Sequence, residues 1–470
     1  MIAAAMLLAA RMRGARMRAI SPCIAAVAWL LPIGAYAQSP GSAQSTTPPQ
    51  RTMSAQMAPS GVGPVRTLTR EQAEALALKN NPQISIGRLN ALVARQFVRQ
   101  QRSALLPTAA LNVTGVDAQP GGRIAAGSLT NSAIYSRAAA GANVSQLVTD
   151  FGRTQNLVAS ANLQAKAQDE TATATTADMV LAVDQSFFNT LETEALVTVA
   201  QQTVDARQTF VDKIQALTDA KLRSELDLSF AKVDAARARL LLLEARNNYE
   251  ASLAALSALL GFNDEQNFQL VEGATAGEAP PPAVEPLIGE ALAQRPEVLA
   301  LRDQVQAAEK FGRAEHDLWL PNVTALGTAG LVPARDNHVP SWWGAVGVNI
   351  NIPVFNGFLF DARAKTADLQ TSVARARLTD LQNNIARDVR NAWQDANRAY
   401  ERLSVTQQLR EQANLALDLA QSRYNLGLSS IVEFSQAELQ KTEADISDTD
   451  ARYQYRLTEI VLRYALGAPN

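Results

Sequence analysis

Apolar residues along this chain change their spacing in a fixed order, and the order occurs twice. Each occurrence opens with an Ala- and Leu-rich stretch of helical spacing that ends before a proline, Pro82 or Pro296. The residue before a proline disfavours the α conformation, so each stretch predicts a short helix that stops there. A second helical stretch ends at Pro107 or Pro321, which are 214 residues apart, as are Pro82 and Pro296. This constant spacing indicates a tandem repeat.

After each Leu-Pro pair the spacing of the apolar residues changes from helical to alternating, with a period of two. In the first repeat the apolar positions of this alternation are Ala109, Leu111 and Val113. In the second repeat the alternation is weaker after Asn322 and clearest at Val346, Val348, Ile350 and Ile352. One apolar and one polar face predict strands between two environments, two strands in each repeat. Four strands cannot close a barrel, which takes about eight. If they face lipid, further copies must pair their edges, with eight strands in a dimer or twelve in a trimer.

Two windows almost free of helix breakers follow the strands. Residues 153–260 contain no Gly or Pro in 108 residues, and residues 358–466 contain only Gly427 in 109. Val197, Val204 and Val211 recur every seven residues in the first window, which is coiled-coil spacing. A helix from Arg153 to Ala220 would be about 100 Å long, too long for a compact domain.

Each window therefore predicts a helical hairpin. We expect the first to reverse at 221–224, where the sequence has no glycine, and the second at 427–430, which begins with Gly427. The returning helices should end at Gly261 and Gly467, because glycine is favoured just after a helix. The repeats are assigned to residues 67–271 and 285–467, with a linker at 272–284 and a tail at 468–470.

The N-terminus has the order of a secretory signal. Four arginines precede an apolar run at 20–33, which is followed by Ala35, Tyr36 and Ala37. This order predicts a signal peptide at 1–37 with cleavage after Ala37. Residues 38–66 are rich in Ser, Pro, Gln, Thr and Gly and are expected to be a disordered lead-in.

Charge and cysteine content exclude several classes of protein. Removing the signal leaves 39 basic residues from the original 43 against 45 acidic ones, so no basic patch suggests nucleic-acid binding. The only cysteine, Cys23, lies inside the signal, so the mature chain has no disulfide framework and no cysteine nucleophile. A lipidated N-terminus at Cys23 is the alternative, which Pro22 and the upstream arginines disfavour.

No motif indicates catalysis. The chain lacks a phosphate-binding loop ending in Lys-Ser or Lys-Thr, a Gly-x-Ser-x-Gly elbow and a His-Glu-x-x-His sequence. Its only histidines, His316 and His338, are isolated. We therefore expect no enzyme activity, no cofactor and no metal site.

Further motifs complete the second repeat. It carries Ile-Pro-Val-Phe-Asn-Gly at 352–357, Tyr-Asn-Leu-Gly at 424–427 and Ile-Val-Glu at 431–433. Together with the doubled Ala-Leu-to-Pro stretch and the Leu-Pro strand entry, these motifs resemble the TolC family of outer-membrane efflux channels, the outer membrane factors. The resemblance covers residues 68–467.

The resemblance implies a mainly α fold with a β part. In this family three copies form a twelve-stranded β-barrel in the outer membrane, continued by a coiled-coil tunnel across the periplasm. The chain would then be a homotrimer in outer-membrane lipid, with most of its residues in the periplasm.

The resemblance also implies a function and partners. The chain would be the passive exit duct of a tripartite efflux or type I secretion system, joined by a periplasmic adaptor (membrane fusion protein) to an inner-membrane pump. The pump would be of the resistance-nodulation-division or ABC type, and the cargo a drug, a metal ion, a polysaccharide or a protein. The alternative is a periplasmic coiled-coil structural or adaptor protein without a membrane barrel.

The family's gate can be placed residue by residue near the second reversal. The first acid of its constriction falls on Glu433, but the second falls on Gln436; the gate tyrosine falls on Tyr424. The gate arginine is replaced by Ser429, and its acidic partner in the first repeat is Asp227. We therefore expect an acid ring without the family's arginine lock.

Two further sets of residues complete the candidate sites. The expected adaptor contacts at the hairpin tips are Leu222, Arg223, Ser224, Gly427, Leu428, Ser429 and Ser430. Trp342 and Trp343 are expected to anchor the barrel at the membrane–water interface, where aromatic rings are enriched.

Overall fold

The structure, a computed structural model, describes residues 66–117, 123–126, 129–133, 136–264, 268–272, 279–335, 337 and 340–467. The predicted signal at 1–37 with its cleavage site after Ala37, the lead-in up to residue 65, the tail at 468–470 and His338 lie outside the described residues. Arg66, the last residue of the predicted lead-in, instead begins strand β1 (Arg66–Leu68).

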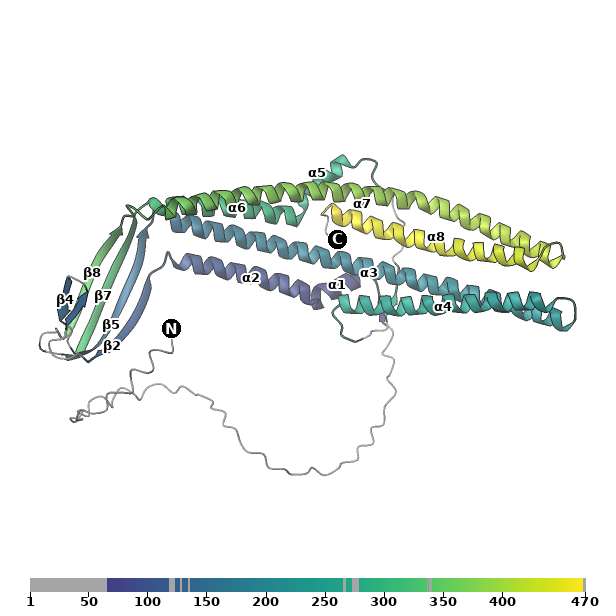
Figure 1. Cartoon of the computed structure of the whole chain (residues 1–470), viewed down its shortest axis with the longest axis horizontal. Coiled ribbons are helices and arrows are strands. Elements are labelled where there is room, and N and C mark those ends of the chain that lie inside the picture. Colours follow the sequence, from purple (N-terminus) through teal and green to yellow (C-terminus); the bar gives the residue numbers. More distant parts are fainter. Residues whose placement is uncertain are drawn as a thin grey trace, which may run out of the picture. The chain divides into compact units, whose positions relative to one another are not determined.

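Four antiparallel strands form one sheet in the order β2–β5–β7–β8 (Figure 1). The strands are β2 (Thr108–Val116), β5 (Arg137–Thr149), β7 (Asn322–Arg335) and β8 (Trp342–Asn351). Each repeat contributes one pair, as the alternation predicts, and β5 and β7 join the two pairs. A small hairpin of β3 (Arg123–Ala126) and β4 (Leu129–Ala133) between β2 and β5 was not predicted.

The strand register gives the sheet one apolar and one more polar face. Opposed residues of neighbouring antiparallel strands point to the same side. One side carries the rows Ala109–Val144–Gly327–Val346 and Val113–Ala140–Leu331–Trp342. The other side carries the rows Ala110–Asn143–Thr328–Ala345 and Asn112–Gly141–Gly330–Trp343. The predicted alternation is confirmed, and it continues across all four strands.

A single layer of helices continues from the sheet (Figure 1). Neighbours in this layer pack in the order α2 (Pro82–Ser103), α3 (Arg153–Asp219), α6 (Pro296–His316) and α7 (Leu359–Asn425). Farther from the sheet, α4 (Glu225–Leu259) and α8 (Ile431–Ala465) pack on α3 and α7, and α8 also contacts α3. The two long hairpins predicted from the windows are thus present and lie side by side.

Both long helices begin at equivalent, conformationally unusual turns. Phe151 and Gly152 have φ of 56° and 107° before α3, and Gly357 and Phe358 both have φ of 65° before α7. A side chain of the preceding polar residue then caps the helix. Asp150 accepts a hydrogen bond from the Thr154 backbone N–H at 2.7 Å, and Asn356 accepts one from that of Phe360 at 3.4 Å. These side-chain acceptors satisfy backbone donors that a helix start leaves unpaired.

The hairpins reverse at 220–224 and 426–430, in agreement with the predicted positions. Each turn contains one residue in the left-handed region, Lys221 at φ 59° and Gly427 at φ 73°. A non-glycine residue in this conformation costs about 1 kcal/mol, so the turn at Lys221 is the more strained of the two. Ser224 and Ser430 then cap α4 and α8 by accepting the N–H groups of Asp227 and Glu433.

Two apolar cores lie where the returning helices end. In the first, α1 (Arg70–Asn80) packs with α3, α4, β1 and β6 (Phe268–Leu270) around the fully buried Leu256. In the second, α5 (Glu285–Gln294) packs with α6, α7 and α8 around the fully buried Val389. The parallel pairing of β1 with β6 was not predicted.

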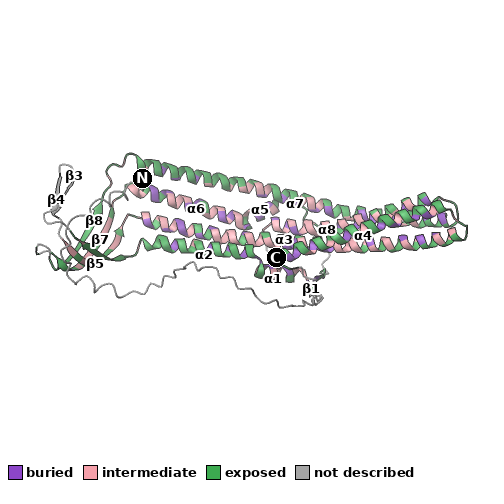
Figure 2. Ribbon diagram, turned by 60° about the horizontal axis from the view of Figure 1, so that its bottom comes forward, coloured by how far each residue is buried: buried purple, intermediate pink, exposed green. Residues whose placement is uncertain are grey.

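Burial differs between the sheet and the helices (Figure 2). Every residue of β8 is exposed in the single chain, whereas the long helices alternate buried and exposed positions. Ala200, Val211 and Ile214 are buried on the heptad face predicted for α3. Among the described residues, no helix is both long enough and apolar enough to span a membrane.

Candidate functional site: the tips of the two helical hairpins

An aromatic cluster joins the two hairpins close to their tips. Phe210 of α3 packs against Tyr424 of α7 and Phe434 of α8, with ring centroids 5.8 and 4.5 Å away, and those two rings stack on each other at 5.7 Å. Ile214 and Ile431 pack against the same cluster. Burial of these side chains at a crossing of three helices holds the two hairpins together.

Tyr424, the expected gate tyrosine, is the most buried of the three aromatic residues. Only 2% of it is exposed, and its ring lies 4.3 Å from the Arg223 guanidinium carbon. The same arginine donates a hydrogen bond from Nη2 to the Tyr424 carbonyl oxygen at 2.9 Å. Burial raises the pKa of the Tyr424 hydroxyl; Arg223 opposes this rise and Asp227 adds to it. Arg223 and Asp227 from the first hairpin therefore surround a tyrosine of the second.

An arginine nevertheless lies at the tips, although not at the family's gate position. Ser429 does stand where the family's arginine was expected, and its hydroxyl is buried without a partner among the described residues. The cation comes instead from the opposite hairpin, as Arg223. A half-buried Arg223 is also a poor candidate for a free adaptor contact, because its guanidinium is engaged within the chain.

Glu433 lies on the first turn of α8 and Gln436 on the second. The backbone N–H of Glu433 donates to the Ser430 hydroxyl at 3.4 Å, and its carboxylate pairs with Arg423 of α7 at 3.1 Å. The Glu433 side chain is 46% exposed, and Gln436 is exposed less than one turn away. An exposed ion pair of this kind contributes little stability, and the Glu433 carboxylate remains accessible to ions.

A second group of polar contacts joins the hairpins near the tips and farther along the helices toward the sheet. Arg207 of α3 forms an ion pair with Glu438 of α8, and both side chains are largely buried. Ser435 of α8 donates a 2.5 Å hydrogen bond to Asp234 of α4. Lys213 donates to the Asn425 side chain at 2.9 Å. Sequence reasoning missed these contacts.

Arg207 nonetheless carried a signal in the sequence. It lies between Val204 and Val211, at a position that the heptad spacing assigns to the seam of α3. A charged residue in an apolar seam needs a buried partner, because an unpaired buried charge is very costly. The seam alone does not identify Glu438, which lies more than 200 residues away in the sequence.

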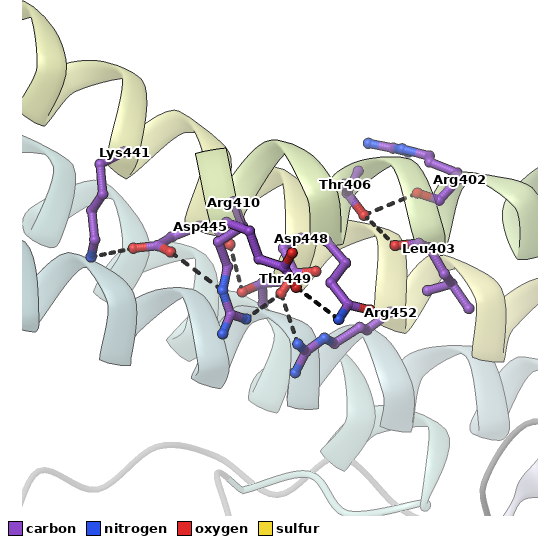
Figure 3. Close-up of polar contacts among 11 residues, drawn as sticks. Arg402, Leu403, Thr406, Arg410, Lys441, Asp445, Asp448, Thr449 and Arg452 are labelled. Carbon is purple, nitrogen blue, oxygen red and sulfur yellow. Dashed lines mark hydrogen bonds and ion pairs between the residues drawn. The ribbon is translucent and has the colours of Figure 1, made fainter. Parts of the chain in front are cut away.

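A further ionic cluster lies within the second hairpin (Figure 3). Asp448 of α8 is buried and accepts from Arg410 of α7 at 2.5 Å and from Arg452 at 2.8 Å. Asp445, one turn earlier, pairs with Lys441. Two arginines on one buried carboxylate compensate its desolvation, and Arg410 joins α8 to α7.

One carboxyl pair connects this region to the first hairpin. Glu192 of α3 hydrogen-bonds to Asp450 of α8, which also forms an ion pair with Arg402 of α7 at 2.7 Å. Burial, followed by the bond and charge of Asp450, raises the pKa of Glu192 to about 7, against the opposing charge of Arg402. The contact between the hairpins is therefore sensitive to protonation near neutral pH.

The other expected tip residues project into solvent. Leu222 and Leu428 are 70% and 67% exposed, and Ser224, Gly427 and Ser430 are exposed beside them. Each tip therefore presents an exposed leucine among small or polar residues.

Metal-binding groups are sparse in the described part of the chain. There, no cluster of three or more His, Cys, Asp or Glu side chains has the arrangement of a metal site. His316 lies 3.1 Å from Asp368, and both side chains are about half exposed.

Comparison with known proteins decides the family. A model of the family described as outer membrane efflux protein matches residues 75–262 and 287–468, one match in each repeat. The chain belongs to the outer membrane efflux protein family. It is an efflux protein of the outer membrane, in agreement with the TolC-family resemblance.

Curated relatives of this efflux protein are similar over most of their length. The outer membrane protein TolC of Vibrio cholerae is 25% identical over 415 residues, which are 83% of this chain and 89% of the relative. OprJ of Pseudomonas aeruginosa is 23% identical, with 83% and 82% covered. The cation efflux system protein CusC of Escherichia coli O157:H7 is 24% identical, with 86% and 85% covered.

Solved structures show the same fold. A crystal structure of CusC matches with a TM-score of 0.75 at 19% identity and covers 90% of this chain and 99% of that one. The outer membrane protein VceC of Vibrio cholerae matches with a TM-score of 0.73 at 18% identity, with 85% and 96% covered. The fold of this efflux protein is therefore that of outer-membrane channels, mainly helical with a small β part.

The efflux protein's two adjacent tryptophans point to opposite faces of the sheet. Trp342 lies in an apolar row with Leu331 and is 68% exposed. Trp343 lies in the more polar row, next to Gly330, and is 39% exposed. Neighbouring residues of a strand point to opposite faces, so at most one of the two expected anchors can face lipid.

Proposed function

We propose that the chain assembles into a homotrimer that serves as the passive outer-membrane exit duct of a tripartite efflux system. The observation that carries the proposal is the open sheet. Within the described residues, β2 and β8 each have one edge without a strand partner, although one face of the sheet is apolar. Unpaired backbone groups are too costly in lipid, so other copies must pair these edges.

Three copies supply twelve strands, enough for a barrel that leaves an open interior. The helical layer supports the same assembly. Its edge helix α4 exposes a row of apolar side chains at coiled-coil spacing, namely Leu226, Phe230, Val233 and Leu240. The opposite edge helix α7 exposes Val405, Leu409, Leu415 and Leu419. In a ring, each α4 lies against the α7 of the next copy, and both rows are covered.

The proposed gate lies at the hairpin tips. Three copies of Glu433 around one axis, with Gln436 beside them, form the constriction and favour cations. Tyr424, Arg223 and Asp227 keep the second hairpin against the first in the closed duct, with Ser429 enclosed beside them. Opening requires these contacts to break.

The proposed partners are a periplasmic adaptor and an inner-membrane pump. The exposed tip residues Leu222, Ser224, Gly427, Leu428 and Ser430 are the surface for the adaptor. The pump, of the resistance-nodulation-division or ABC type, supplies the energy and chooses the cargo, in efflux or in type I secretion. Trp342, on the apolar face, is the proposed anchor in outer-membrane lipid.

Engineered cysteines test the assembly. The chain's only cysteine is Cys23, in the predicted signal, so the background is free of thiols. Leu111 of β2 and Ile350 of β8 lie on the apolar face of opposite edge strands. A chain carrying both Leu111→Cys and Ile350→Cys should give disulfide-linked dimers and trimers on denaturing gels after oxidation. Neither single variant should give a trimer band. A ladder that stops at the monomer would contradict the proposal.

The periplasmic alternative without a barrel is tested by fractionation. An outer-membrane duct stays with the membranes when they are washed with carbonate. A protein released by that wash would favour the alternative.

A further inference from the structure

Trp343 occupies a position that two glycines create for it. Its own strand is β8, but its indole extends across β7 and reaches β5. A Cβ atom built on Gly330 would lie 2.6 Å from both Cε2 and Cζ2 of the indole. A Cβ atom built on Gly141 would lie 2.6 Å from Cζ2 and 3.1 Å from Cη2. Any larger residue at either position would displace the ring.

The geometry leaves one side of the ring open. Its inner side lies against the backbone of two strands, where the missing side chains would be. Yet 39% of Trp343 remains exposed. The surrounding positions on this face carry small or polar side chains, including Ala345, Thr328 and Asn143. The indole is therefore a flat apolar surface on the more polar face of the sheet.

The position is specific to the second repeat. The helices that follow the two strand pairs, α3 and α7, begin at Arg153 and Leu359, which are 206 residues apart. By that spacing, the counterpart of Trp343 in the first repeat is Arg137, which carries no ring. A trimer would thus contain three such rings rather than six.

The face on which Trp343 lies is the interior of the proposed duct, because the opposite face, with Trp342, is the apolar one. Trp343 is also the second residue of β8, at the end of the sheet away from α7 (Figure 1). The three rings would therefore lie around the lumen near its outer end.

We propose that Trp343 is a binding platform for planar aromatic compounds inside the duct, near its exit. An aromatic ring stacks on an indole held flat, and the two glycines fix the indole before the ligand arrives, which reduces the entropy lost on binding. The inference rests on the proposed trimeric duct. The alternative is a purely structural role, in which the indole covers the two glycines and strengthens strand pairing without binding a ligand.

Block of single channels by proflavine, a planar aromatic cation, tests the platform. The concentration that blocks half of the current should rise about 3- to 10-fold in Trp343→Ala. It should change little in Trp343→Phe, which keeps a ring, or in Trp342→Ala, the matched control on the other face. Block by tetraethylammonium, a cation without a ring, should be the same in all variants. Equal proflavine block in wild type and Trp343→Ala would overturn the platform.

A second measurement covers the case in which Trp343→Ala does not assemble. Proflavine should quench a saturable part of the tryptophan emission of the wild-type protein and of Trp342→Phe, and this part should be lost in Trp343→Phe. Persistence of the saturable part in Trp343→Phe would also overturn the platform. A wild-type protein that forms no channel at all would instead count against the proposed duct, so the two failures are distinguishable.

Discussion

Arg223 of the first helical hairpin lies over the ring of Tyr424 in the second, 4.3 Å from its centroid, and donates a hydrogen bond to its backbone carbonyl oxygen. This contact joins the two repeats at the proposed gate. It also places the cation on the hairpin opposite to the one that the resemblance suggested.

Arg223→Ala should favour the open duct. It removes a cation–π contact and a hydrogen bond, together worth about 1–3 kcal/mol, so the ratio of open to closed channels should rise about tenfold. Single-channel recording in planar bilayers measures the open probability. Lys221→Ala, at an exposed position of the same turn, is the control and should leave it unchanged. An open probability in Arg223→Ala equal to that of the control would contradict the lock.

Glu433→Gln should weaken cation selectivity. Three accessible carboxylates close to one axis attract cations, and the substitution removes their charge while keeping the side-chain shape. The reversal potential in a salt gradient should move toward zero, and block by multivalent cations should weaken. Gln436→Glu adds a second ring of charge and should change both quantities in the opposite direction. Unchanged selectivity in both variants would show that these residues are outside the constriction.

The ion pair of Arg207 with Glu438 should be costly to break on one side only. Arg207→Leu leaves Glu438 charged and largely buried, which should destabilise the fold by about 3 kcal/mol. Replacing both residues by Leu should recover most of this loss, because a buried pair is often worth no more than apolar packing. Thermal unfolding followed by circular dichroism compares the three proteins. A double variant no more stable than Arg207→Leu would argue that the pair itself stabilises the hairpins.

The Glu192 contact should make stability depend on pH. Its folded pKa of about 7 is above the ordinary value of 4.5. The folded state therefore binds the proton more tightly, and the stabilisation from this group is full below pH 4.5 and is lost as pH rises through about 7. Between these limits the melting temperature of wild type should fall relative to that of Glu192→Gln, which cannot ionise. Parallel curves for the two proteins would refute the assignment.

Much of the fold could be predicted because it depends on local pattern. The alternation at Val346, Val348 and Ile350 identifies β8, and the windows free of Gly and Pro identify the hairpins, since both signals follow the period of one element. The pairing of β1 with β6 lacks such a signal, because each strand has three residues and the partners are about 200 residues apart.

The candidate site was predictable only in part, because it depends on how two hairpins are placed against each other. Tyr424 and Glu433 could be located by their motifs. Arg223, which contacts Tyr424, and Glu438, which pairs with Arg207, could not be located in this way. The rotation of one hairpin and its shift along the other decide which side chains meet. The opposite directions of Trp342 and Trp343 follow from the strand period, but the period does not say which face lies inside.

The mass of the intact assembly tests the central claim most directly. Native mass spectrometry of the protein, purified from outer membranes in detergent, should give the mass of three mature chains. A monomer, a dimer or an assembly of four chains would contradict the proposed twelve-stranded duct.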